Sequence, residues 1–239
     1  MDNNGNYEAY VRSNSEDMAH IQSAFINRVY AWMSTGLAVT GIIAWYLGVQ
    51  KVEFILRHAN WFLPLMVVEV LLVIALSGMI NKINSVVATL LFFIYAAVNG
   101  VTLSWIFLSY QIGSVANVFF ATCATFAGMS LYGHLTKRDL TGIGAFCGMA
   151  LWGLIVAGII NIFWRNSMAE LVISCVGVLV FVGLTAYDTQ KIKLLALSAA
   201  EGSLDAETSR KVAIIGALEL YLDFINLFLY LLRLFGRRR

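Results

Sequence analysis

The sequence is poor in helix-breaking residues and in charge. It has a single proline, Pro64, among 239 residues, and only 13% of its residues are charged. Proline interrupts helices because it lacks an N–H and clashes with the preceding turn, so its near-absence permits long, uninterrupted helices. The formal net charge is only +2, which provides no basic surface for nucleic acid, and we expect no nucleic-acid partner.

Residues that build metal and catalytic centres are also scarce. We expect buried free thiols rather than disulfides, and no zinc or haem site, because no CxxC spacing or ligand cluster is present. The HExxH and GxSxG motifs are missing, so the sequence does not predict an enzyme or a tightly bound cofactor. The cysteines and histidines are scattered along the chain: Cys123, Cys147, Cys175, His20, His58 and His134.

Apolar residues are abundant and fall in long runs. The chain is 60% hydrophobic and has a mean hydropathy of +0.78. A membrane-crossing helix needs about 20 apolar residues, and the runs are continuous rather than alternating, which disfavours a β-barrel. The sequence therefore predicts an all-α polytopic membrane protein with seven transmembrane helices, at about 29–49, 61–80, 85–107, 112–133, 141–163, 170–190 and 212–234.

The polar segments divide the chain. Residues 1–28 are polar and lack the pattern of a signal peptide, so we expect a flexible N-terminal tail followed by a membrane domain over 29–236. The segment Lys191–Lys211 is predicted to be the one sizeable soluble loop. In the fifth span, Gly144 and Gly148 form a GxxxG pair, which favours close helix packing.

The distribution of lysine and arginine gives two topologies. With a cytoplasmic N-terminus and seven crossings, nine basic residues lie inside and seven outside. If the last segment re-enters instead, its four arginines move inside and the ratio becomes thirteen to three. The charge rule favours a re-entrant tail, whereas the length of 212–234 favours a crossing. We expect seven crossings.

The last span, Val212–Leu234, is unusual because it is polar on one face. Glu219, Asp223 and Asn226 are spaced by four and three residues, so they share one face of a helix. Glu69 lies in the second span and Asp188 at the end of the sixth. An acid at the centre of a membrane helix costs about 3 kcal/mol, so these side chains are expected to face protein, water or a cation.

Two outcomes relieve that cost, and they compete. The carboxylates can take up protons, or they can bind a hard cation such as Ca²⁺ or Mg²⁺. Both link the site to pH, which indicates a proton-sensitive cation pathway. The structural alternative is that the acids are protonated and hydrogen-bond to neighbouring helices, or, for Asp188, that it forms a surface ion pair with Lys191 three residues on.

Several stretches resemble the Bax inhibitor-1 family, also called the transmembrane Bax inhibitor motif family, and its bacterial branch in particular. The resemblance covers nearly the whole chain from about residue 25. It is carried by the stretches GLTAYDTQK (183–191), ALELYLDFINLFL (217–229), LLRLFG (231–236), MSLYGHLTKRDLTGIG (129–144) and LSGMINKI (76–83).

The resemblance implies a seven-helix fold whose last helix is central and wrapped by three helix hairpins. It also implies a pH-sensitive calcium leak in a bacterial inner membrane, with Ca²⁺ and H⁺ as the ions. Asp188 and Asp223 fall on the family's hydrogen-bonded aspartate pair, which is its pH sensor and the expected metal contact. Glu69 falls near an acid implicated in ion passage, and Lys82 is the candidate for a basic latch to Asp188.

One point of geometry restricts this assignment. Asp223 lies about 16 Å along its helix from Val212 at 1.5 Å per residue, whereas Asp188 is at the edge of its span. The two can meet only if the seventh helix begins early or the sixth continues past Lys191. Glu219 and Asn226 are pore candidates on the same face, although no separate role for Glu219 follows from the sequence.

A second function of a different class is also compatible with the sequence. Relatives are reported to modulate a membrane protease or a stress response, so the chain could be a membrane interaction protein. In that case the polar N-terminal tail and the Lys191–Lys211 loop would carry the contacts, and the helices would be a scaffold in the lipid bilayer.

Overall fold

The computed structural model describes the backbone of residues 3–80, 82–164 and 166–239, and side chains from Glu16 onward. Seven helices in this part of the chain are long and apolar enough to cross a membrane, which confirms the predicted all-α architecture. The elements follow one another as α1 (Asn3–Trp45), η1 (Tyr46–Gln50), α2 (Val52–Arg57), η2 (Ala59–Trp61), α3 (Phe62–Met79), α4 (Ser85–Leu103), α5 (Ile106–Ser109), α6 (Ile112–Leu135), α7 (Thr141–Trp164), α8 (Ser167–Ala200) and α9 (Ala206–Phe235).

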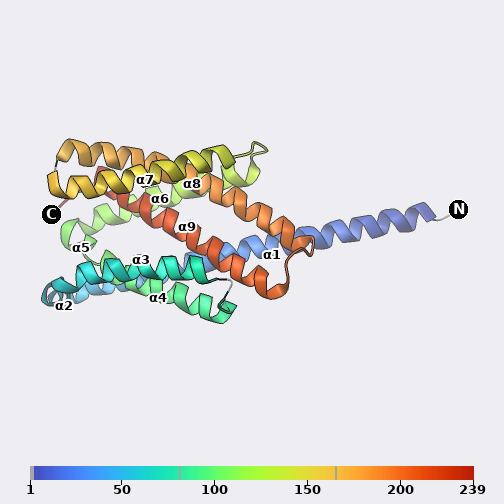
Figure 1. Ribbon diagram of the computed structural model, residues 1–239, viewed down its shortest axis with the longest axis horizontal. Coiled ribbons are helices and arrows are strands. Elements are labelled where there is room, and N and C mark those ends of the chain that lie inside the picture. The colour runs from blue at the N-terminus through green and yellow to red at the C-terminus, as the bar shows by residue number, and fades with distance from the viewer. Residues whose placement is uncertain (1–2, 81, 165) are drawn as a thin grey trace.

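The C-terminal helix α9 lies at the centre of the bundle (Figure 1). It packs against α1, α4, α6 and α8, while α3 packs on α4 and α7 packs on α8. Two thirds of the apolar window of α9 is buried, more than in any other candidate span of the described chain. Its core side chains include Leu218, Leu220, Tyr221 and Leu227, each exposed by 1% or less. The helix is therefore surrounded by protein rather than lipid on most of its circumference.

Side-chain caps fix where the later helices begin. The Asn84 side chain accepts a 2.8 Å hydrogen bond from the Val87 amide at the start of α4. The Asn166 side chain likewise accepts hydrogen bonds from backbone amides at the start of α8. Asp205 accepts from the amides of Glu207 and Thr208 at the start of α9. A hydrogen bond from the Thr208 side chain, together with those from the two amides, lowers the pKa of the Asp205 carboxyl, because hydrogen bonds favour its charged form.

The loop predicted over Lys191–Lys211 is wrong in extent. Helix α8 continues to Ala200 and α9 begins at Ala206, so the connection is only 201–205. Ile192 and Ala196 explain the extension, because they are 1% and 0% exposed and pack in the core. Gly202 takes a positive φ of 73° in the short turn, a conformation that residues with a Cβ rarely adopt.

Most of the predicted N-terminal tail is part of helix α1. Helix α1 begins at Asn3 and runs without a break into the first span, and Figure 1 shows its first part projecting from the bundle. Phe25 and Val29 are 3% and 0% exposed, so packing against the bundle begins before residue 29. Polar composition did not prevent helix formation here, since no proline interrupts the segment.

The two chain termini lie at opposite ends of the bundle (Figure 1). Helix α9 runs its full length as one helix of 30 residues, about 45 Å at 1.5 Å per residue. It does not turn back, so the re-entrant tail indicated by the arginine count is not observed. The geometry agrees with seven crossings.

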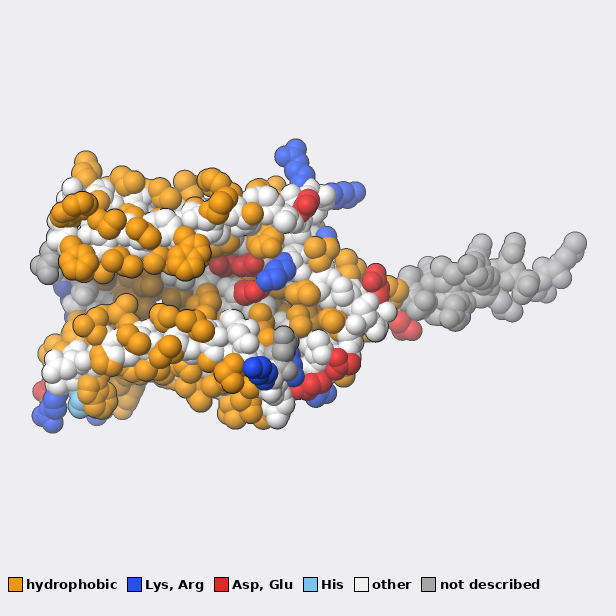
Figure 2. Space-filling model, viewed as in Figure 1, with side chains coloured by type: hydrophobic (Ala, Val, Ile, Leu, Met, Phe, Trp, Pro, Cys, Tyr) orange, Lys and Arg blue, Asp and Glu red, His pale blue; other side chains and the backbone are white. Residues whose placement is uncertain are grey.

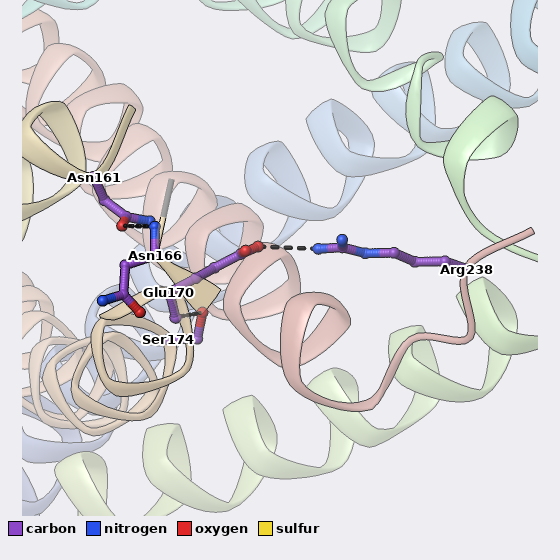
Figure 3. A network of polar contacts seen from close by, with 5 residues as sticks. All are labelled: Asn161, Asn166, Glu170, Ser174 and Arg238. Carbon is purple, nitrogen blue, oxygen red and sulfur yellow. Dashed lines mark hydrogen bonds and ion pairs between the residues drawn. The ribbon is translucent and has the colours of Figure 1, made fainter. Parts of the chain in front are cut away.

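The C-terminal residues are tied to the far end of the bundle. Arg238 forms a 3.0 Å ion pair with Glu170 of α8 (Figure 3), and the backbone of Arg237 accepts from the Gln111 amide. Next to this pair, the Asn166 amide donates to Asn161 of α7 over 3.1 Å. The polar contacts in Figure 3 thus connect α7, α8 and the tail at one end.

Two glycines permit close helix approaches. Gly133 of α6 lies directly against the backbone of Ala186 in α8, and a Cβ at Gly144 of α7 would meet the ring of Tyr187. Gly148, the partner of Gly144 in the predicted GxxxG pair, has open space around it. The packing prediction is therefore confirmed for Gly144 alone.

We predict that Gly133→Ala destabilises the protein by about 1–3 kcal/mol, the usual cost of overpacking. The added methyl group would overlap the Ala186 carbonyl, and backbone cannot rotate away as a side chain can. Thermal unfolding in detergent measures the loss. Gly128→Ala is the matched control because Gly128 lies on the same helix with nothing near its Cβ position, and an equal loss in both variants would contradict the prediction.

Candidate functional site

Asp188 of α8 and Asp223 of α9 meet in the interior. A side-chain hydrogen bond joins their carboxyl groups, and Asp223 is only 4% exposed. Two carboxyl groups can hydrogen-bond to each other only when one carries a proton. The structure thus brings the two predicted sensor residues together, and both conditions for their meeting hold, since α8 continues past Lys191 and α9 begins early.

A second pair lies one turn from the first. Lys191 Nζ is 2.6 Å from Glu219 Oε1, so α8 and α9 are linked by an ion pair beside the aspartates. Lys191 and Glu219 also interact electrostatically with Asp188. The suggested Asp188–Lys191 surface pair is therefore replaced by a bond across the helices, and Glu219 gains a partner that the sequence did not indicate.

Two buried oxygens of this cluster have no hydrogen-bond partner. They are Asp223 Oδ2 and Glu219 Oε2. A buried acceptor without a donor costs free energy, so water, a proton or a cation bound to these oxygens would be stabilising. Three carboxyl groups and one ammonium give the cluster an excess of negative charge that a cation would offset.

One stripe of α9 is only partly covered by neighbouring helices. The partly exposed positions recur every three to four residues, which places them on a single face. Figure 2 shows a recess between two apolar parts of the surface, in which acidic and basic side chains lie together. Asn226 is on this stripe, but its amide donates to the Leu222 carbonyl over 2.8 Å. The stripe consists of Ile215, Glu219, Leu222, Asn226 and Leu229.

Glu69 lies apart from the aspartate pair. Its carboxylate accepts a hydrogen bond from Thr102 of α4 and interacts electrostatically with the hydroxyl groups of Tyr95 and Tyr221. Tyr221 is held by a 2.7 Å hydrogen bond with Thr40 of α1. Glu69 is thus the inward-facing acid of the otherwise lipid-exposed helix α3, and no contact within the described residues joins it to Asp188 or Asp223.

Lys82 does not form the latch in this structure. It lies exposed in the turn after α3, and the described residues show no ion pair between it and Asp188. Lys191 is the cation beside Asp188 instead. Its position three residues after Asp188 was a visible signal, but its bond to Glu219 depends on the register of α8 against α9.

A resident metal centre has few ligands here. The described residues contain no group of three or more histidine, cysteine, aspartate or glutamate side chains arranged to hold a metal ion. Ca²⁺ takes six to eight oxygen ligands, so Asp188 and Asp223 would leave most of its coordination shell to water.

The chain is similar to known proteins over nearly all of its length. The family described as "Inhibitor of apoptosis-promoting Bax1" matches residues 22–239. Inner membrane protein YbhL of Escherichia coli (strain K12) is 45% identical over 218 residues, which cover 90% of this chain and 92% of YbhL. An uncharacterized protein of Borreliella burgdorferi is 42% identical over 221 residues, or 92% of this chain and 94% of that protein. All the candidate site residues lie within the matched range.

We predict that Lys191→Met destabilises the protein in a pH-dependent manner. Without the ammonium, the cluster keeps three carboxyl groups and no cation, so the cost is largest at alkaline pH, where they are ionised, and shrinks as acid neutralises them. A partly exposed pair suggests a loss of about 1 kcal/mol. The measurement is the thermal unfolding midpoint of the purified protein as a function of pH.

Lys193→Met is the matched control for this change. Lys193 lies on the same helix and donates to the neutral carbonyl of His134 over 2.7 Å, so its loss should not depend on carboxylate ionisation. Parallel pH profiles for the two variants would show that Lys191 does not stabilise the acidic cluster.

Proposed function

Since the chain belongs to the Bax inhibitor-1 family, we propose that it is a pH-sensitive leak channel for calcium, or a similar cation, in a bacterial inner membrane. The membrane assignment follows the name of its relative YbhL. The observation that carries the proposal is the hydrogen-bonded pair of Asp188 and Asp223 between α8 and the central helix α9.

The pair supplies a proton-dependent contact between two helices. With one shared proton, the carboxyl groups attract and hold α8 against α9. Without the shared proton, two like charges at hydrogen-bond distance repel each other. This repulsion favours separation of the two helices. The pair titrates as a unit, so a change of pH biases the closed arrangement against an open one. Flux is then expected to rise with pH.

The partly exposed stripe of α9 supports a route for the ion. Glu219 and Asn226 place polar atoms along this stripe, and the partnerless Asp223 Oδ2 and Glu219 Oε2 are hard oxygen ligands of the same helix. Glu69 adds a carboxylate from the side of α3. Oxygen ligands suit Ca²⁺ or Mg²⁺, and the choice of calcium rests on the family.

The interaction-protein alternative has less support from the geometry. It assigned the contacts to the N-terminal tail and to the Lys191–Lys211 loop. Side chains of residues 1–15 lie outside the described residues, and the loop is reduced to 201–205 by the extension of α8 and α9. The interface of α8 and α9 holds instead the aspartate pair and the ion pair of Lys191 with Glu219.

We predict that Asp188→Asn and Asp223→Asn each abolish the pH dependence of calcium flux into liposomes containing the purified protein. An amide cannot release the proton that switches the pair, so flux should be the same from about pH 6 to 8, the range in which a buried carboxyl pair can titrate. Fluorescence of a calcium indicator inside the liposomes measures the rate.

Asp139→Asn is the control for the aspartate variants. Asp139 lies exposed in the α6–α7 connection, where hydrogen bonds from Thr141 lower the pKa of its carboxyl, and it should retain the original profile. A normal pH profile in Asp188→Asn and Asp223→Asn would refute the sensor, and absence of ion flux in the unmodified protein would refute the leak.

Glu69→Gln should lower cation flux severalfold while leaving its pH midpoint unchanged. The substitution removes a negative charge that attracts cations but keeps an acceptor for Thr102, and it does not touch the aspartate pair. Glu53→Gln, at an exposed position of α2, provides the charge-matched control. A shifted midpoint in Glu69→Gln would place Glu69 in the sensor instead of the route.

A further inference from the structure

A cavity of about 210 Å³ opens at the end of the bundle where α4 and α9 begin. Three segments that are far apart in sequence form it. Arg28 and Trp32 come from α1, Ser85, Val86 and Thr89 from the first turns of α4, and Arg210 and Ile214 from α9. Two guanidinium groups thus line one small space, although 182 residues separate them in the chain.

The nitrogen donors of this cavity lack acceptors among the described residues. No hydrogen bond or ion pair within the described residues engages the side chains of Arg28 and Arg210 or the indole N–H of Trp32. The two hydroxyl groups are already committed, because Ser85 donates to Glu207 Oε2 over 2.9 Å and Thr89 donates to the Ser85 carbonyl over 2.8 Å. The cavity therefore presents donors and positive charge.

One acid, Glu207, interacts with this cavity without hydrogen-bonding to either arginine. Glu207 interacts with Arg210 electrostatically, but both of its oxygens bind the start of α4, with Oε1 2.6 Å from the Ser85 amide and Oε2 bound to the Ser85 hydroxyl. The carboxylate thus caps the N-terminus of α4, where the helix dipole favours it. Its hydrogen bonds therefore leave the donors of both guanidinium groups without a partner in the described residues.

The walls of the cavity combine polar and apolar surface. Ile214 is buried at 3% exposure, whereas Val86 is 65% exposed on the outer side of α4. Val86 belongs to a predicted membrane span, so it faces lipid next to the arginines. A phosphate next to an acyl chain matches this pattern, because basic pockets between membrane helices recognise anionic headgroups and arginine binds phosphate through a bidentate fork.

We propose that this cavity binds the phosphate group of an anionic phospholipid, held by Arg28, Arg210 and Trp32. The apolar rim at Val86 favours a lipid over free phosphate, although the two share the same charged group. The site is separate from the aspartate pair and does not depend on ion conduction.

Lipid retention by the purified full-length protein tests the proposal. The protein is equilibrated in neutral detergent with equal amounts of phosphatidylglycerol and phosphatidylcholine, and bound lipids are counted by native mass spectrometry. We expect phosphatidylglycerol to be preferred, and Arg28→Gln/Arg210→Gln to lower that preference about tenfold, since each basic side chain adds to the attraction of an anionic headgroup. Arg28→Lys/Arg210→Lys should retain part of it, because charge remains without the fork.

Lys137→Gln/Arg138→Gln is the matched control. It removes the same charge from exposed positions in the α6–α7 connection and should keep the original preference. Inorganic phosphate without lipid distinguishes the source. If phosphate raises the unfolding temperature of the unmodified protein but not of Arg28→Gln/Arg210→Gln, and phosphatidylglycerol is not retained, the ligand is soluble phosphate. Equal loss of preference in both double variants, or no binding of either anion, would overturn the proposal.

Discussion

The contact between Asp188 and Asp223 is the constraint on which the rest of the bundle depends. A carboxyl group that is 4% exposed in a membrane helix is costly unless its polar atoms find partners. Its partner is on the preceding helix. Helices α8 and α9 must therefore lie side by side, in a register that places their acidic residues next to each other. This requirement explains why α9 is central, since a helix with this polar content cannot face lipid on most of its circumference.

Helix length follows from the same requirement. Asp223 lies deep in its helix and Asp188 would be at the boundary of a helix that ended at residue 190. The chain resolves the mismatch by extending α8 to Ala200 and starting α9 at Ala206, with Gly202 in the turn between them. Ile192 and Ala196 stabilise the added turns by burial. Lys191 of the second pair lies just past residue 190, so its bond to Glu219 depends on the extension of α8.

Much of this architecture could be predicted from local patterns. Continuous apolar runs identify the seven spans, and the spacing of Glu219, Asp223 and Asn226 predicts a polar stripe because a helix has a fixed period. What could not be predicted depends on register between helices. One must know which turns of neighbouring helices lie side by side to predict the bond of Lys191 to Glu219. The same holds for the open space around Gly148 and for the convergence of Arg28 with Arg210. The loop was predicted too long because the charged residues at 201–211 indicated a soluble segment, whereas the apolar positions before them belong to the extended helix.

The lysine within the acidic cluster bears on how an ion could pass. Three carboxyl groups without a cation would bind a divalent ion strongly and release it slowly, whereas conduction requires binding that is favourable but weak. Lys191 lies 2.6 Å from Glu219 and interacts with both aspartates, so it already satisfies part of the negative charge. In the proposed leak, its flexible stem would allow the ammonium to move aside as a cation arrives. An internal, displaceable cation of this kind would lower the affinity of the proposed site without removing its attraction for positive charge.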